Sequence, residues 1–207
     1  MKKGLWILCL SVVTGIAAAE GPLPDIFATN SVVLFQGDSI THGGRGGDLN
    51  HYLGHGYQAI VAQRYLGYRP DLKLEFLNRA CSGDTTVKLL ARWDADAINV
   101  AVTENGYAAA FGCPPGPVVR HPDMLSLLVG VNDLHSLKLP PDAFRSNLVA
   151  LVTRSLAANP KLRLVFGEPF LVPQSPDPLM AQYQAITAEI AARFDAPLIK
   201  YQRLFNE

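Results

Sequence analysis

Short apolar runs alternate along the chain with stretches whose apolar residues recur at helical spacing. Glycine, proline or small polar residues bound each apolar run, as is typical of strands inside a sheet. The run from Ser31 to Phe35 is almost continuously apolar, which indicates a strand buried on both faces of a parallel sheet. The predicted strands are Ser31–Phe35, Leu72–Leu77, Met124–Val129, Leu162–Phe166 and Pro197–Lys200.

Helices are predicted between these strands, at Tyr57–Leu66, at Asp84–Trp93, from Pro140 to Leu156, and at Leu179–Phe194. Thr85 or Asp84 can cap the second of them, and Pro141 suits the first turn of the third. Because strand and helix alternate throughout, we expect right-handed crossovers and a parallel sheet. The pattern therefore predicts an α/β fold, a three-layer doubly wound sheet of about five strands.

Small polar residues follow three of the predicted strands. Gly37-Asp38-Ser39 follows the first, the block from Asn78 to Thr85 follows the second, and Gly130-Val-Asn-Asp133 follows the third. Open α/β sheets bind ligands beyond the carboxyl ends of their strands, so the three blocks predict a site at one sheet edge. The alternative for Gly37-Asp38-Ser39 alone is a plain turn and helix cap.

With these blocks in this order, the chain from about Val32 to its last residue resembles the SGNH, or GDSL-type, hydrolases, which are esterases and lipases. The resemblance implies a flavodoxin-like sheet and a serine nucleophile, Ser39. It also implies an oxyanion hole formed by the N–H groups of Ser39 and Gly83 and by the side-chain amide of Asn132. A turn glycine at Gly83 and a turn residue at Asn132, with its amide bonded to the backbone, remain the alternatives.

Two further stretches, 53–57 (Leu-Gly-His-Gly-Tyr) and 90–93 (Leu-Ala-Arg-Trp), look like the subgroup that contains carbohydrate acetyl esterases. The resemblance thus implies hydrolysis of small acyl esters, with acetyl on carbohydrate as the favoured case. The chain departs from the family between Asp96 and Pro122, where relatives have a short link. There, Ala97–Val102 is expected to be a strand or a helix end, and Asn105–Val119 a loop.

The general base is missing from the expected place. In the family it comes from an Asp-x-x-His block near the C-terminus, and no such block occurs in the 207 residues. We expect that block beyond Glu207, so the fold should lack its last helix and this chain should hydrolyse esters poorly. A catalytically incomplete protein that binds an ester or a carbohydrate is the alternative function. The histidines, none at the family position, are His42, His51, His55, His121 and His135.

Composition narrows the choice of substrate. The chain has 18 basic and 18 acidic residues and no long run of one charge, so nothing favours a nucleic-acid or anionic-membrane partner. Its 49% of hydrophobic residues can fill the core of one domain. The glycines after Thr41 do not form a phosphate-binding pattern, which counts against an unrelated nucleotide- or flavin-binding domain. We expect a small-molecule or carbohydrate ester substrate and no cofactor or metal.

The N-terminus has a charged start, an apolar stretch from Gly4 to Ile16 and an Ala-Ala-Ala-Glu end, which predicts a secretory signal cleaved after Ala19. The expected organisation is a signal peptide at 1–19, a lead-in at 20–30 and the hydrolase domain at 31–207, secreted or periplasmic, without stable membrane association. A retained anchor is the alternative. In an oxidising compartment Cys81 and Cys113 are predicted to pair, unless both are buried thiols.

Overall fold

A five-stranded parallel sheet forms the centre of the chain. The structure, a computed structural model, describes residues 26–46, 52–103, 117–171 and 177–206. The strands lie in the order β2-β1-β5-β6-β7, so the second strand along the chain is at one edge and the first lies inside it. This is the flavodoxin-like order, and the predicted α/β fold is confirmed. The strands are β1 (Val32–Gly37), β2 (Glu75–Asn78), β5 (Met124–Leu128), β6 (Arg163–Gly167) and β7 (Leu198–Ile199).

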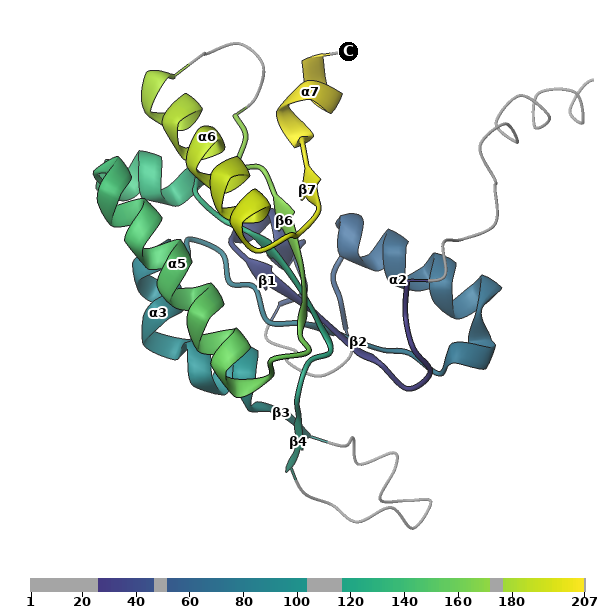
Figure 1. Cartoon of the computed structure of the whole chain (residues 1–207). Helices are drawn as coiled ribbons and strands as arrows, with labels where there is room; N and C mark the ends of the chain where they lie inside the picture. Colours follow the sequence, from purple (N-terminus) through teal and green to yellow (C-terminus); the bar gives the residue numbers. More distant parts are fainter. Residues whose placement is uncertain (1–25, 47–51, 104–116, 172–176, 207) are drawn as a thin grey trace, which may run out of the picture.

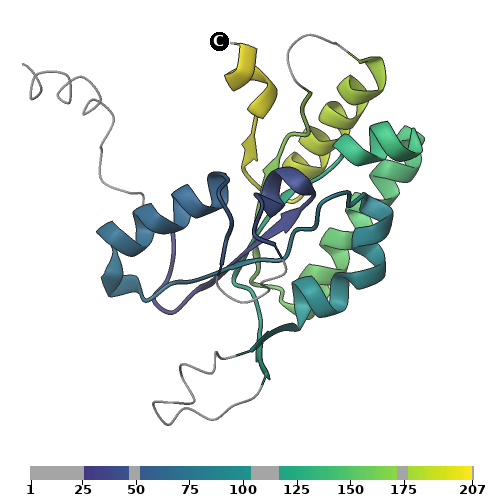
Figure 2. The ribbon, with the colours of Figure 1, turned by 180° about the vertical axis from the view of Figure 1, so that it is seen from behind.

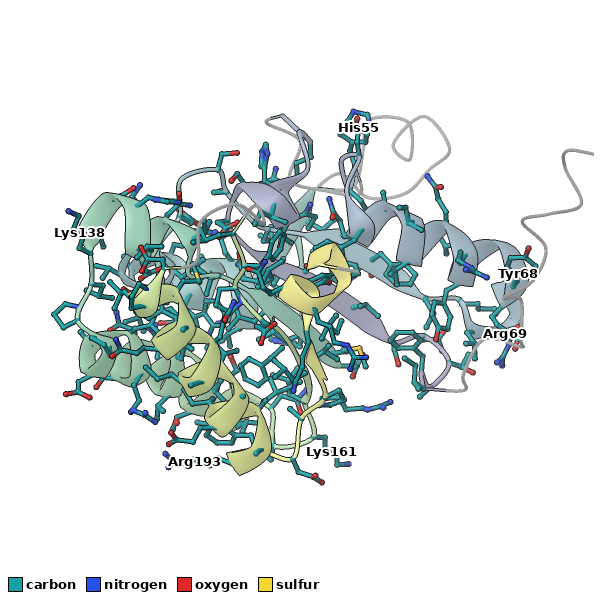
Figure 3. All side chains as sticks on the ribbon, turned by 90° about the horizontal axis from the view of Figure 1, so that it is seen from above. His55, Tyr68, Arg69, Lys138, Lys161 and Arg193 are labelled. Carbon is teal, nitrogen blue, oxygen red and sulfur yellow. The ribbon has the colours of Figure 1, made fainter. Side chains whose placement is uncertain are left out.

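Helices cover both faces of this sheet. On one face lie α3 (Thr86–Trp93), α5 (Pro141–Ala158) and α6 (Pro178–Arg193), and on the other lies α2 (Tyr57–Tyr68) (Figures 1 and 2). Figure 3 looks along the layers from above, with the far end of α2 marked by Tyr68 and Arg69, across the molecule from Arg193 of α6. The four predicted helices and the three-layer arrangement are therefore present.

The interior strand β1 divides the core in two because its side chains alternate between the faces of the sheet. Leu34, fully buried, packs in the cluster that contains Trp93 and Phe144 beneath α3, α5 and α6. Val33 belongs to the opposite cluster, which includes Tyr65 of α2. Burial on both faces explains the almost continuous apolar run that predicts this strand.

The predicted second strand starts three residues too early. Pro70–Leu72 forms a single 3₁₀ turn, and β2 begins only at Glu75. Lys73 lies between them with a φ of 49°, in the left-handed region. A strand cannot run through a residue in that conformation, so the apolar pattern of Leu72 and Leu74 reflects burial beneath α2 rather than pairing in the sheet.

The described residues on either side of 104–116 form a small antiparallel ribbon. A short π-helix, η2 (Asp94–Ile98), leads into β3 (Val100–Thr103), which pairs with β4 (Pro117–Arg120). Ala97–Val102, expected to be a strand or a helix end, contains the end of η2 and most of β3, whereas the loop prediction is wrong for residues 117–119. Proline is tolerated at the first position of a strand, and β4 starts at such a proline. Residues 104–116 lie outside the described part.

A short helix, α7 (Tyr201–Asn206), follows β7, where the sequence analysis expected no helix. The Tyr201 ring lies with its centre 5.8 Å from that of Tyr57 and 5.6 Å from that of Phe170. Six residues are too few for a periodic apolar pattern to stand out, which explains why the sequence did not predict this helix. Across the described ranges, no helix combines the length and the apolar character that crossing a membrane requires.

Candidate functional site

The three polar blocks meet at the carboxyl edge of three adjacent strands. Phe35 of β1 is opposite Asn78 of β2, and Gly37 is opposite Leu128 of β5. Beyond the strands, the Cys81 N–H donates to the Gly37 carbonyl at 3.2 Å, which joins the first block to the second. The structure thus brings together the segments that carry Ser39, Gly83 and Asn132.

Gly37 is the point where β1 turns into the first block. Its φ is 155°, and a Cβ there would lie only 2.0 Å from the Leu128 carbonyl oxygen. The neighbouring strand therefore passes too close for any side chain, and only glycine allows both the turn and the approach.

Ser39 is the first residue of a one-turn helix, α1 (Ser39–His42), and its side chain is exposed. Asp38 caps this turn through a bond from the Ile40 N–H to its carboxylate at 3.0 Å. The N–H groups of a first helical turn have no partner inside the helix, so the Ser39 N–H is a donor at the start of α1. Hydroxyl and N–H thus occur on one residue at the sheet edge.

Asn78 holds this turn against the rest of the edge. Its buried amide donates to the Thr41 carbonyl at 2.8 Å and to the Leu53 carbonyl at 2.7 Å. The Thr41 hydroxyl also bonds to the Tyr57 hydroxyl at 3.1 Å. These bonds tie α1 to the segment before α2, so that stretch 53–57, which looks like part of the acetyl esterase pattern, supports the position of Ser39.

Gly83 lies exposed in the turn that precedes α3. Its φ is 80°, and the Cβ of a larger residue would find nothing closer than the Lys88 ammonium at 3.9 Å. Glycine is therefore favoured by backbone conformation and not by lack of room. The Lys88 Nζ donates to the Gly83 carbonyl at 2.9 Å, so the turn is held from the first turn of α3.

Asn132 follows β5 and is half-buried beside the second block. Its Nδ2 donates to the Asp84 carbonyl at 2.9 Å, so the amide does bond to the backbone, as the alternative interpretation expects. An amide nitrogen carries two hydrogens, and this bond uses one of them. The bond fixes the orientation of the amide, and the second hydrogen remains for another acceptor.

Arg92 of α3 connects three segments near the site. The sequence analysis assigned it no role beyond the resemblance. Its guanidinium donates to the Asp84 carboxylate at 2.5 and 3.0 Å, to Asp96 at 2.8 Å and to the Gln36 side-chain oxygen at 3.0 Å. Gln36 directly precedes Gly37, so Arg92 connects β1 with the second block. The planar guanidinium of an arginine can donate to several acceptors at once, and here three oxygens from different residues accept its hydrogen bonds.

Arg45 is a buried cation that sequence reasoning missed. Only 3% of its surface is exposed, and its guanidinium donates to the Ala80 carbonyl at 2.8 Å. It lies in the glycine-rich segment after Thr41, and it connects the described part of that segment to the second block. Burial of an arginine leaves no periodic signal in a loop sequence, so the pattern could not reveal it.

The histidine rings that could stand near Ser39 have other partners. His42 accepts or donates at 3.3 Å to the Ser82 hydroxyl through Nδ1, and its Nε2 lies 3.3 Å from the Gly46 carbonyl. His55 pairs with the Tyr52 hydroxyl at 2.8 Å. His121 bonds to the Ile98 carbonyl, and His135 is exposed in the turn after Asn132. His51 and Cys113 lie outside the described residues, so the predicted Cys81–Cys113 disulfide remains a prediction.

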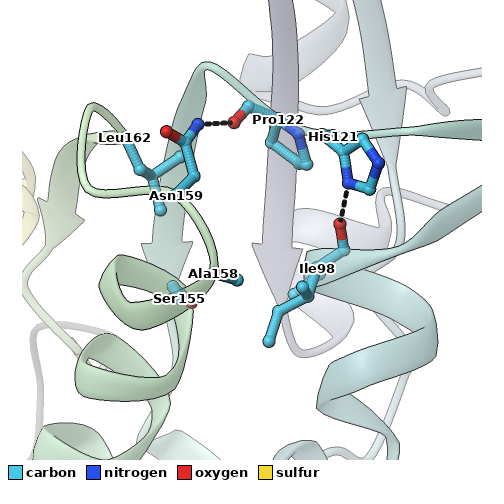
Figure 4. A pocket seen from close by; sticks show the side chains of 8 residues that line it. Ile98, His121, Pro122, Ser155, Ala158, Asn159 and Leu162 are labelled. Atoms are coloured by element: carbon cyan, nitrogen blue, oxygen red, sulfur yellow. Dashed lines mark hydrogen bonds between the residues drawn. The ribbon is translucent and has the colours of Figure 1, made fainter.

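A small pocket lies at the opposite edge of the sheet, between the end of α5 and the residues before β5 (Figure 4). His121 and Asn159 line it, and the Asn159 amide donates to the Pro122 carbonyl at 3.0 Å. Its volume of about 30 Å³ holds no more than one or two water molecules. Among the described residues, no group of three or more metal-ligating side chains could hold an ion.

Asp38 is 1% exposed, and its burial raises the pKa of its carboxyl from 3.8 to about 7, with Asp133 and Asp84 adding to the rise. Between about pH 4 and pH 7 the native chain then binds a proton that the unfolded chain has released. Stability should therefore fall as the pH rises through this window, by up to roughly 4 kcal/mol, and level off above it.

Replacing Asp38 by Asn is expected to flatten this decline, because an amide keeps the oxygen that accepts from Ile40 but does not ionise. Urea unfolding of both proteins at about pH 4.5, 6 and 8 measures the difference. Asp142→Asn, on the exposed side of α5, serves as the matched control. Equal slopes in the native protein and in Asp38→Asn would contradict the burial argument.

Comparison with known proteins gives consistent results. A profile of the GDSL-like Lipase/Acylhydrolase family matches residues 35–207. The acetylxylan esterase of Geobacillus stearothermophilus is 28% identical over 193 residues, which cover 84% of this chain and 78% of that protein. The solved structure of its acetylxylan esterase Axe2 has 26% identity and a TM-score of 0.67, covering 86% of this chain and 80% of the other.

Three further structures extend the likeness. LAE5, an alpha/beta hydrolase enzyme from the metagenome of Lake Arreo, Spain, has 25% identity and a TM-score of 0.65, over 86% of this chain and 80% of its own. Catalytic mutants of Axe2 in which a serine or a histidine is replaced by alanine have the same fold as this chain.

Proposed function

Because the chain belongs to the GDSL-like lipase/acylhydrolase family of carboxylic ester hydrolases, we propose that it cleaves small acyl esters through Ser39. Acetyl groups on a carbohydrate are the favoured substrate class. The observation that carries the proposal is the meeting of three polar blocks at the carboxyl edge of β2, β1 and β5, joined by the Cys81–Gly37 and Asn132–Asp84 hydrogen bonds.

In the proposed reaction, the Ser39 hydroxyl oxygen attacks the ester carbonyl carbon and loses its proton to a base. Negative charge develops on the carbonyl oxygen, which accepts hydrogen bonds from the N–H groups of Ser39 and Gly83 and from the Asn132 amide. The tetrahedral intermediate collapses, the alcohol leaves with a proton, and water then releases the acid from the acyl-serine.

No histidine of the described residues is proposed as the base. A base must reach hydrogen-bond distance of the Ser39 hydroxyl, whereas His42, His55 and His121 each bond to another group. A serine and a histidine each give a catalytic mutant in Axe2 when replaced by alanine. That chemistry supports the assignment of Ser39 and indicates what kind of base to expect.

The preference for acetyl on carbohydrate rests on the similarity to acetylxylan esterase. The net charge of zero agrees with a neutral substrate. Export is part of the proposal, with residues 1–19 as a leader, 20–30 as a lead-in and 31–207 as the hydrolase domain. Its support is the charged, apolar and small-residue order at the N-terminus.

An ester- or carbohydrate-binding protein without useful turnover is the second candidate. The observation that favours it is that both nitrogens of the His42 ring have partners other than Ser39, namely the Ser82 hydroxyl and the Gly46 carbonyl. The two candidates differ in whether the acid product accumulates.

Rates with p-nitrophenyl acetate, butyrate and octanoate test the enzyme. We expect kcat/KM for acetate to exceed that for octanoate by at least about tenfold, since a pocket shaped for a small group discriminates by roughly that factor per misfitting group. The quantity compared is the Ser39-dependent part, obtained by subtracting the rate of Ser39→Ala. Release of acetate from an acetylated xylooligosaccharide extends the test to carbohydrate.

A preference for octanoate would overturn the small-acyl proposal. Binding of the acetylated sugar without Ser39-dependent release of acetate would favour the binding protein instead.

A further inference from the structure

We propose that Asp133 is a positioning residue. Through its hydrogen bonds to Thr86 at the start of α3, it fixes the position of the Asn132 amide relative to the Gly83 turn. The inference rests on the proposed function, in which Asn132 and Gly83 stabilise the same oxyanion. It adds a residue that does not touch the substrate and acts through its neighbour.

Asp133 grips Thr86 with three hydrogen bonds. The Thr86 N–H donates to the two carboxylate oxygens at 3.0 and 3.1 Å, and the Thr86 hydroxyl donates at 2.5 Å. Asp133 is fully buried, so water does not compete for these bonds. Bonds to a buried carboxylate are among the stronger ones in proteins and define a single geometry.

A third residue fixes the direction of the hydroxyl bond. The Asn147 amide of α5 donates to the Thr86 hydroxyl oxygen at 2.9 Å. Because an amide N–H₂ group only donates, the Thr86 oxygen accepts there, and its own hydrogen points to Asp133. The order from Asn147 through Thr86 to Asp133 is therefore set by chemistry and links α5, α3 and the end of β5.

Because Thr86 and Asp133 are close in sequence to Gly83 and Asn132, the hydrogen bonds between them also fix the positions of the two oxyanion donors. Thr86 is three residues after Gly83, and Asp133 is next to Asn132. The bond from the Asn132 amide to the Asp84 carbonyl closes a second link between the same two segments. Two links at different points fix both the separation and the relative rotation of the segments, and oxyanion donors need placement within about 0.5 Å.

The location of Asp133 also explains how a carboxylate can be buried there. It lies at the N-terminus of α3, where free N–H groups and the helix dipole favour negative charge. Burial still raises the pKa of Asp133, which indicates a cost of keeping the charged form. A carboxylate accepts hydrogen bonds through both oxygens, as the Thr86 N–H and hydroxyl require here, whereas an amide would turn an N–H₂ group toward one of these donors.

A double-mutant cycle tests the proposal. The variants are Asp133→Asn, Asn132→Ala and the pair, and the readout is the second-order rate of Ser39 modification by a fluorophosphonate, with Ser39-dependent kcat and KM beside it. In the modification, oxygen on phosphorus also gains negative charge in the oxyanion hole. Asp133→Asn keeps the volume but turns an N–H₂ group toward the Thr86 N–H.

We expect Asp133→Asn alone to lower the modification rate and kcat about 10- to 100-fold, with KM changed by less than about twofold. In the Asn132→Ala background the same change should cost less than about threefold, because the amide it positions is gone. Equal factors in both backgrounds would overturn the inference. An Asn132→Ala variant with the original rate would instead remove the oxyanion role and with it the proposed mechanism.

Thr86 supplies a test that does not alter the buried acid. Thr86→Ser keeps the N–H and the hydroxyl and should retain the original rate, whereas Thr86→Val should lose about 3- to 10-fold. Thr187→Val is the matched control, because its buried hydroxyl donates to the Tyr183 carbonyl within α6. Both valine variants should lower Tm, and only Thr86→Val should lower the rate. Equal rates for Thr86→Val and Thr187→Val would contradict the proposal even if Asp133→Asn fails to fold.

Discussion

Ser39→Ala is expected to abolish covalent modification of the protein by a fluorophosphonate. The serine oxygen displaces fluoride from phosphorus and loses its proton, and alanine has no atom that can do so. Hydrolysis of p-nitrophenyl acetate should lose its Ser39-dependent part, and the remainder is what binding and the oxyanion donors provide, at most about 10³–10⁴ over water. Mass spectrometry of the intact protein and of its peptides measures the adduct and its place.

Ser82→Ala is the matched control for this experiment. Ser82 is also exposed, lies in the neighbouring block and has a histidine nitrogen 3.3 Å from its hydroxyl. It lies in the turn after β2 and not at the start of a helix, and we expect its replacement to leave the labelling of Ser39 in place. If labelling survives Ser39→Ala and disappears in Ser82→Ala, the nucleophile is Ser82 and the assignment of Ser39 is wrong.

Asn132→Ala is expected to lower Ser39-dependent kcat by about 10²–10³, which is the usual effect of removing one oxyanion donor. KM should change little, because the bond strengthens only as charge develops on the carbonyl oxygen. Steady-state rates with p-nitrophenyl acetate provide the measurement.

Asn159→Ala controls for the loss of a half-buried amide. Asn159 donates to the Pro122 carbonyl at the opposite edge of the sheet, and its replacement should affect stability without changing kcat. If both variants lose kcat equally, the loss reports on folding and the donor role of Asn132 is wrong.

The order of the chemistry could be predicted because it is local. Ser39, Gly83 and Asn132 each follow a strand by a few residues, and parallel strands bring their carboxyl ends to one edge. The apolar runs were strong enough to place β1, β5 and β6 within two residues of their observed ends. Motif and strand together therefore identified the edge and the blocks that meet there.

What the sequence did not reveal is the set of contacts between distant segments. Asp133 meets Thr86 across 47 residues, and Gln36 meets Arg92 across 56. A single polar residue in a loop has no periodicity, so its partner is known only when the fold is known. The 3₁₀ turn before β2 and the short helix after β7 were missed for a related reason, since each is shorter than the window in which a pattern can be recognised.

The close approach of Leu128 to Gly37 shows that the glycine and the serine of the Gly-Asp-Ser triplet serve different purposes. The glycine is required by the neighbouring strand, because the Leu128 carbonyl oxygen would lie 2.0 Å from any added Cβ. The Ser39 side chain, by contrast, is exposed, so its replacement is expected to cost little stability. A chain could therefore trade the serine away and keep both glycine and fold. Finding the glycine in another sequence therefore indicates a shared fold. The serine two positions later is the residue that distinguishes an active hydrolase from a relative that has kept only the fold.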